Sequence, residues 1–177
     1  MALYHFSEDP GIEVFEPRPV RVPSRRPPGR EWLNGPLVWA IDDWRQPMYL
    51  FPRECPRILW WPLPTTTPAD RARYWSAADL RMIAYVEEAW IERIRTAEVY
   101  RYELSPESFV DLDDAGMWVS RTAVEPVRRE RLTDLPSALA DRQVSLRTLA
   151  DLTPLRDMWS TSLHVSGIRL RNAKGWL

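Results

Sequence analysis

The chain has 177 residues, of which 45% are hydrophobic and 28% charged, and its formal net charge is −1. This composition is typical of a globular protein, and the length predicts one domain over residues 1–177 with a single core. With this balanced charge, the protein as a whole would not be attracted electrostatically to nucleic acid or to an anionic membrane. Because the sequence has neither a membrane-length apolar run nor a signal peptide, we expect a soluble, cytoplasmic protein that contacts no membrane.

Cysteine occurs once, at Cys55. A lone cysteine excludes an internal disulfide framework and is compatible with a reducing cytoplasm. The flanking prolines of PRECPRI favour a small buried residue over a nucleophile at this position.

The first third of the chain predicts short strands joined by turns and loops. The string ALYHF indicates a strand that ends at the turn SEDPG, where Asp9 can bond the backbone and Pro10 fixes φ. Residues 17–35 are rich in proline and arginine without periodicity, which predicts a long surface loop. Apolar runs at 36–42 and 57–63 indicate buried strands, and 43–52 indicates a short helical turn or loop between them.

The clearest helical pattern runs from Ser76 to about Arg95. The string SAAD has the form of a capping box, with Asp79 three residues after Ser76. At 100° per residue one face of this helix would be apolar, and Glu87 would lie within that face. The members of the face are Leu80, Ile83, Ala84, Trp90, Ile91 and Ile94.

The remainder of the chain alternates strand and helix signals. Strands are predicted at 98–105, 116–120, 124–132, 144–149 and 165–172, and short helices at 133–142 and 153–163. Thr133 or Asp134 would cap the first helix, and Thr153 would cap the second, with Pro154 at its first position. The fold class predicted is therefore α+β: a mostly antiparallel sheet or sheets, a long central helix and two short C-terminal helices.

Several common chemical signatures are missing from the sequence. Its six glycines form neither GxGxxG nor a P-loop, and its two histidines and one cysteine have no zinc-ligand spacing. The string DLDDAG at 111–116 fits either a cation site or, more simply, an acidic turn. We therefore expect no metal site and no certain cofactor.

Four residues remain as candidates for a binding site: His5, Trp39, Tyr49 and Glu87. Each also has a structural interpretation. His5 fits a core histidine, and the two aromatic residues fit packing positions. Glu87 fits a buried carboxylate paired with an arginine such as Arg101.

Strings throughout the chain resemble a family of uncharacterised bacterial single-domain proteins. They include LYHFSEDPGIEVFEPRP, PLVWAIDDWRQPMYLFPRECPR, EEAWIERIR, YRYEL and IRLRNA. The resemblance covers nearly the whole chain and implies no particular activity.

A second resemblance is to the ADP-ribosyltransferase fold. YHFS is similar to the first-strand motif in which a histidine contacts a ribose of NAD, which implies that role for His5 with Ser7 nearby. VWAIDDWRQPMY is similar to a stretch with two aromatic residues around nicotinamide, which implies stacking by Trp39 and Tyr49. MWVSRTAVEPV resembles a late strand of that fold.

One position departs from this second pattern. Where the poly(ADP-ribose) polymerases of that fold carry a catalytic glutamate, this chain has Met117. A carboxylate from elsewhere, Glu87 or Glu125, would have to stabilise the positive charge that develops on the ribose during transfer.

Two function hypotheses follow. The first is an ADP-ribosyltransferase-like domain that binds NAD as substrate in a cleft between its first two strands, with Arg18 or Arg53 on the diphosphate. On this hypothesis His5 and Trp39 lie on neighbouring strands, and their side chains open to that common cleft. The alternative is a non-catalytic module that binds a small molecule or an unidentified protein partner, which Met117 favours. Nucleic-acid binding is disfavoured by the charge balance, although a local basic patch remains at Arg21, Arg25, Arg26 and Arg30.

Overall fold

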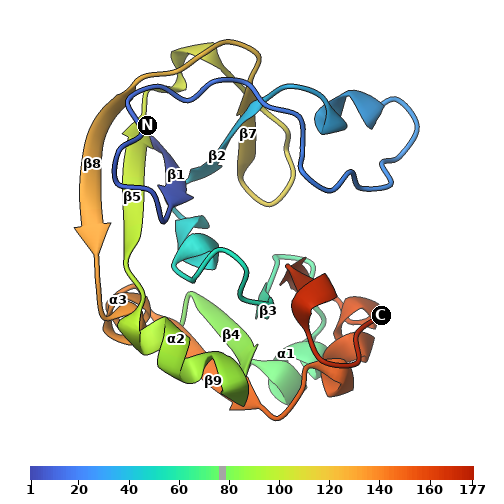
Figure 1. Ribbon diagram of the computed structural model, residues 1–177. Helices are drawn as coiled ribbons and strands as arrows, with labels where there is room; N and C mark the ends of the chain where they lie inside the picture. Colours follow the sequence, from blue (N-terminus) through green and yellow to red (C-terminus); the bar gives the residue numbers. More distant parts are fainter. Residues whose placement is uncertain (76–78) are drawn as a thin grey trace. The chain divides into compact units, whose positions relative to one another are not determined.

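The computed structural model describes residues 1–75 and 79–177, which form two compact units (Figure 1). Each unit is built from two separated stretches of chain. Unit 1 comprises residues 1–46 and 99–132, and unit 2 comprises residues 47–98 and 133–177. Each unit contains one β-sheet, built from its own set of short strands.

Unit 1 is organised around a six-stranded sheet of order β6-β7-β2-β1-β5-β8 (Figure 1). All of its strand pairs are antiparallel. Antiparallel neighbours need only short connections, which suits a chain with many turn residues and few helices. The strands are β1 (Leu3–Ser7), β2 (Val38–Asp42), β5 (Val99–Leu104), β6 (Phe109–Asp111), β7 (Met117–Ser120) and β8 (Pro126–Leu132).

The two faces of this sheet carry different apolar clusters, because successive side chains of a strand alternate between faces. One cluster is formed by Leu3, Phe15, Val38, Ala40, Tyr102, Leu104, Phe109 and Val124. The other is formed by Leu33, Leu37, Leu112 and Val119, with Trp39 and Met117 packed against it. Short 3-10 helices at Glu31–Asn34 (η1) and Pro106–Ser108 (η4) lie in the connections.

Unit 2 contains a four-stranded mixed sheet of order β10-β3-β4-β9. Its strands are β3 (Arg57–Trp61), β4 (Met82–Glu87), β9 (Val144–Leu149) and β10 (His164–Ile168), of which β4 and β9 are parallel. Its helices are α1 (Pro68–Tyr74), α2 (Ile91–Thr96) and α3 (Leu135–Asp141). The 3-10 turns are η2 (Gln46–Tyr49), which begins in unit 1, η3 (Glu88–Trp90), η5 (Thr153–Ser160) and η6 (Leu170–Asn172).

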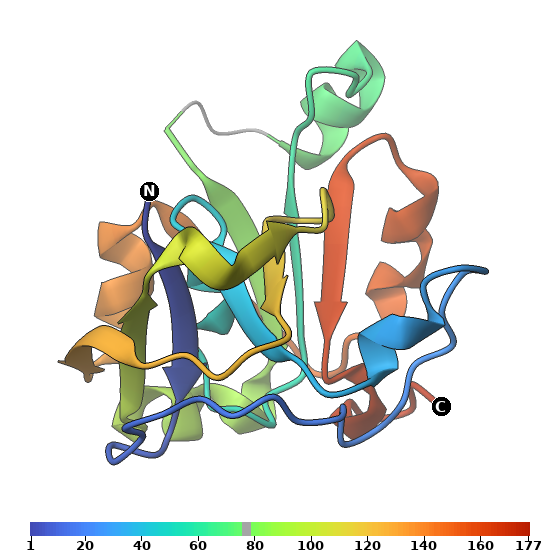
Figure 2. The same ribbon diagram turned by 90° about the horizontal axis from the view of Figure 1, so that it is seen from above.

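One face of the unit 2 sheet packs under the C-terminal segment. Figure 2 shows η5 beside β10, and Met158 of η5 joins Ile58, Trp60 and Ile83 in one buried cluster. Among the described residues, no helix has the length and apolar character needed to span a membrane.

The α+β class and the predominance of antiparallel pairing are confirmed, but the predicted long central helix is wrong. Ser76 lies outside the described residues, and Met82–Glu87 is a strand between β3 and β9. Of its six residues, all but Tyr85 are buried. A strand buried on both faces is apolar nearly throughout, so its pattern resembles that of a buried helix over a few residues.

The C-terminal helix predictions are confirmed in one case and corrected in the other. Asp134 caps α3, and its side chain accepts the Ser137 N–H. The segment from Thr153 is a 3-10 helix, η5, and Asp151 rather than Thr153 provides the side-chain acceptor at its start, for the Thr153 N–H.

Candidate functional site

The most unusual buried group in unit 2 is the guanidinium of Arg57, the first residue of β3. Arg57 is 2% exposed, and it donates from Nε to the Met48 carbonyl (2.8 Å) and from Nη1 to the Cys55 carbonyl (2.9 Å). The rings of Tyr49 and Phe51 lie 5.7 and 5.0 Å from its central carbon. Within residues 1–75 and 79–177, no carboxylate forms an ion pair with Arg57. A buried cation needs compensation, and here two main-chain carbonyls and two aromatic rings surround the guanidinium.

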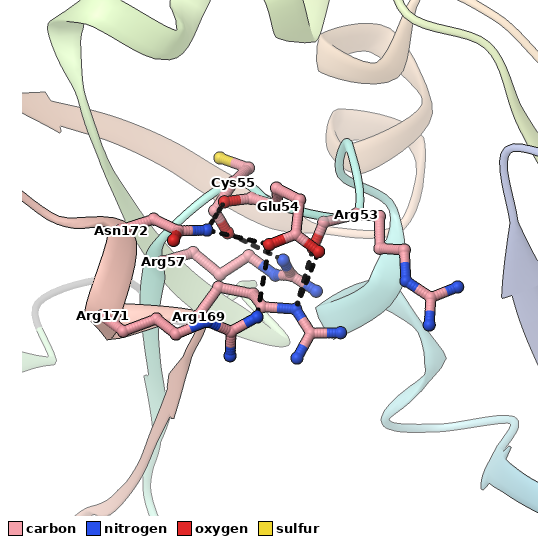
Figure 3. A network of polar contacts seen from close by, with 7 residues as sticks. All are labelled: Arg53, Glu54, Cys55, Arg57, Arg169, Arg171 and Asn172. Atoms are coloured by element: carbon pink, nitrogen blue, oxygen red, sulfur yellow. Dashed lines mark hydrogen bonds and ion pairs between the residues drawn. The ribbon is translucent and has the colours of Figure 1, made fainter. Parts of the chain in front are cut away.

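The register of β10 on β3 brings further arginines to the same place. Ile168 is the register partner of Arg57, so the chain leaves β10 next to the loop that precedes β3. Arg169 then adopts the left-handed conformation (φ 56°) and begins the turn η6. As a result, the side chains of Arg169, Arg171 and Asn172 reach residue Glu54 of that loop (Figure 3).

We call Arg53, Glu54, Arg57, Arg169, Arg171 and Asn172 the arginine cluster. Figure 3 shows that Arg169, Arg171 and Asn172 all contact the Glu54 carboxylate. Its oxygens lie 3.6 Å from Arg169 Nε, 3.3 Å from Arg171 Nη2 and 3.0 Å from Asn172 Nδ2. Two guanidinium groups, of Arg169 and Arg171, therefore contact this one carboxylate, and those of Arg53 and Arg57 lie nearby.

The pKa values of the cluster reflect this crowding. Burial, with a smaller contribution from the positive charge of Arg169, lowers the pKa of Arg57 to about 10. Burial, followed by the charges of Arg171 and Arg53, also lowers the pKa of Arg169, against the opposing effect of Glu54. The hydrogen bond from Asn172 and the neighbouring guanidinium groups lower the pKa of Glu54 despite its partial burial. With a pKa of about 10, Arg57 stays protonated at neutral pH.

Two neighbours of the cluster complete its surroundings. The Cys55 thiol is buried, and burial raises its pKa to about 12, so it is protonated at neutral pH, as expected for a structural cysteine.

Glu87, at the end of β4, is 5% exposed and accepts the Lys174 N–H at 2.7 Å. The predicted burial of Glu87 is correct, but its place is a strand and its partner is a main-chain amide rather than an arginine.

His5 and Ser7 lie on β1 in unit 1. The Nδ1 atom of His5 is 2.8 Å from the Trp39 carbonyl oxygen, and its ring packs on Phe15 with centroids 4.6 Å apart. Ser7 Oγ accepts the Asp9 N–H at 3.1 Å and so begins the predicted turn. Both side chains thus have defined structural roles.

His5 and Trp39 occupy neighbouring strands, as expected, but their side chains point to opposite faces of the sheet. The register pairs Leu3 with Asp42 and Tyr4 with Ile41, so residues 3 and 5 share a face with residues 40 and 42. Trp39 belongs to the cluster on the other face, where Arg26 lies 5.7 Å from its ring. The expected common cleft for the two side chains is therefore wrong.

The remaining predicted residues divide between the units. Arg18 is in unit 1, where its main chain bridges Leu37, and Met117 and Glu125 are in the same unit. Tyr49, Arg53 and Glu87 are in unit 2. Arg53 belongs to the arginine cluster, and the Tyr49 ring adjoins Arg57.

Sequence reasoning missed Glu54, Arg57, Arg169, Arg171 and Asn172 as a site. The available signal was the pair of arginine-containing strings RECPR and IRLRN, which the sequence separates by more than a hundred residues. Only the pairing of β3 with β10 makes them neighbours.

Two shallow pockets in unit 1 have a different character. One, of about 260 Å³, is lined by Asp42, Arg45 and the acidic turn 111–116; the other, of about 300 Å³, includes Arg26, Arg30, Asp113 and Asp114. In the described part of the chain, no group of acidic, histidine or cysteine side chains has an arrangement that could hold a metal ion. The basic loop is also internally bonded, since Arg26 donates to Asn34 and Arg30 to the Leu112 carbonyl.

The described residues form an α+β protein with two sheets and a cluster of arginine side chains in unit 2. The chain belongs to a family of unknown function, DUF6886, whose model matches residues 4–173 and so spans both units. No curated protein and no solved structure matches the chain.

Proposed function

We propose that the protein is a small-molecule-binding module that takes a phosphorylated ligand at the arginine cluster. The observation that carries this proposal is the buried Arg57 guanidinium, held by carbonyl groups and aromatic rings without a carboxylate of its own among the described residues. A ligand anion bound at the accessible Arg169 and Arg171 would add negative charge next to this buried cation without having to reach it.

The chemistry of the donors favours phosphate over a single carboxylate. Guanidinium groups bind the oxygens of phosphate in pairs through their planar fork of N–H groups. Several neighbouring guanidinium groups suit a ligand with two or more negative charges, such as a phosphate monoester or a diphosphate. The exposed side chains of Arg169 and Arg171, with 31% and 35% of their surface accessible, can be reached from solvent.

The geometry supports binding better than ADP-ribosyl transfer. The transferase hypothesis needs His5 and Trp39 in one cleft, whereas their side chains lie on opposite faces of the unit 1 sheet. The position of the expected glutamate is Met117, and Glu87 is buried against a main-chain amide. The diphosphate role that the sequence suggests for Arg53 fits the binding module equally well.

Isothermal titration calorimetry on the full chain with inorganic phosphate, pyrophosphate, ADP and NAD tests the proposal. We expect binding of at least one of these ligands and at least a roughly tenfold loss of affinity in Arg169→Gln, since one charged contact to phosphate contributes on that order. Arg95→Gln is the matched control, because Arg95 is an exposed arginine of unit 2 outside the cluster. If none of the four ligands binds, or if Arg95→Gln weakens binding as much as Arg169→Gln, the proposal is wrong.

A further inference from the structure

The Glu54 side chain occupies the donors that a bound phosphate would use. Its carboxylate accepts hydrogen bonds from Arg171 Nη2 at 3.3 Å and Asn172 Nδ2 at 3.0 Å, and it forms an ion pair with Arg169, whose Nε lies 3.6 Å away. Carboxylate and phosphate oxygens are recognised by the same N–H donors in the same geometry. An incoming phosphate and the Glu54 carboxylate therefore cannot both take these contacts.

The attachment of Glu54 allows its carboxylate to leave while the loop stays in place. The main-chain carbonyl of Glu54 accepts a second hydrogen bond from Asn172 Nδ2, at 2.7 Å, that does not involve the carboxylate. The neighbouring Arg53 carbonyl also accepts from Arg169 Nε at 3.3 Å. The loop and η6 thus remain joined through main-chain acceptors after the side chain moves.

The Glu54 carboxylate is also accessible enough to be exchanged. The side chain is 39% exposed, so it can be rehydrated without any change in the strands. Ion pairs at this exposure contribute little net stability, because the charges are nearly as well solvated apart.

We propose that Glu54 is an intramolecular competitor of the ligand: in the ligand-free protein its carboxylate holds Arg169, Arg171 and Asn172, and a phosphate displaces it on binding. This inference rests on the proposed function and adds its regulation. The cluster is kept ordered and partly neutralised when empty, and the affinity is set by the difference between the ligand and the built-in carboxylate.

The test compares pyrophosphate binding to wild type, Glu54→Gln and Glu88→Gln by isothermal titration calorimetry at neutral pH. Glutamine keeps the size and an oxygen acceptor for Asn172 but removes the charge that competes with the ligand and repels it. We expect Glu54→Gln to bind pyrophosphate roughly tenfold more tightly than wild type, which corresponds to about 1.4 kcal/mol. Glu88, an exposed glutamate of unit 2 outside the cluster, provides the control, and its variant should bind like wild type.

The outcomes separate the two proposals. Equal or weaker binding by Glu54→Gln, with wild type still binding, overturns the competitor role and leaves the phosphate site intact. Absence of binding in wild type and in Glu54→Gln overturns both. If Glu54→Gln does not fold, Glu54→Asp replaces it, because the shorter side chain withdraws the carboxylate from the arginines and should also tighten binding; unchanged or weaker binding there overturns the competitor role.

Discussion

His5 donates from Nδ1 to the main-chain oxygen of Trp39 across the β1–β2 pair, at 2.8 Å. Because a carbonyl oxygen can only accept, the neutral ring carries its proton on Nδ1. This contact and the packing on Phe15 assign the histidine a structural role in unit 1.

Replacement of His5 by alanine is expected to lower the free energy of unfolding by about 1–3 kcal/mol, through loss of the hydrogen bond and of the ring contact. Urea titration followed by tryptophan fluorescence measures the change. His5→Phe keeps the ring and removes the donor, so it should lose less. An unchanged unfolding midpoint in His5→Ala would contradict the structural role.

Tyr102→Phe should destabilise the protein although it removes only one oxygen. The Tyr102 hydroxyl donates to the Asp9 carbonyl at 2.6 Å and accepts the Ile12 N–H at 3.2 Å, and the residue is 1% exposed. Its removal leaves two main-chain groups of the turn without this partner, at a cost of about 1–3 kcal/mol. Urea titration checks the value, with Tyr85→Phe as the control, since Tyr85 is only partly buried.

Cys55 is expected to resist alkylation in the folded protein. Its thiol is buried, and its pKa of about 12 leaves almost no thiolate at neutral pH. Mass spectrometry after iodoacetamide treatment should show an unmodified chain under native conditions and one added group in guanidinium chloride. Rapid labelling without denaturant would show that the thiol is accessible and reactive.

Stability should depend on pH through Glu54. Its pKa in the folded protein is lowered from the ordinary value of 4.5, so its contribution is present above that value and is lost as the pH falls through the lower folded pKa. The stability difference between wild type and Glu54→Gln should therefore be largest at neutral pH and shrink below pH 4.5. Paired urea titrations measure it, and a difference that grows on acidification would contradict the assignment.

Short strands bounded by turn residues were predictable because the signals for each are local. The β1 and β2 strands were found from their apolar runs and from the SEDPG turn after β1. The β4 strand was mistaken for part of a helix because its apolar residues are nearly continuous, and its neighbours β3 and β9 lie far away in sequence. The β6 strand, only three residues long, gave too little pattern to detect.

The candidate site could be predicted only in fragments. Tyr49 was proposed from a motif, and Arg53 as a possible diphosphate contact. Arg57 and Arg169 come close together because the register of β3 on β10 pairs Arg57 with Ile168. A register is set by pairing between distant segments, and neither segment contains that information alone. The sequence also could not show on which face of the sheet the Trp39 side chain lies, because one step in register exchanges the two faces of a strand.

The alternation of the chain between units 1 and 2 has a consequence for synthesis on the ribosome. The sheet of unit 1 lacks its edge strand until Leu132 has emerged, and the sheet of unit 2 lacks β10 until Ile168 has emerged. Neither sheet can be completed early. The strands β1, β2 and β3 therefore leave the exit tunnel with unpaired edges, because β5, β7 and β10, which pair with them, are synthesised later. Such a nascent chain depends on protection of these edges, and we expect its yield to respond to chaperone supply and elongation rate more than to the stability of the finished protein.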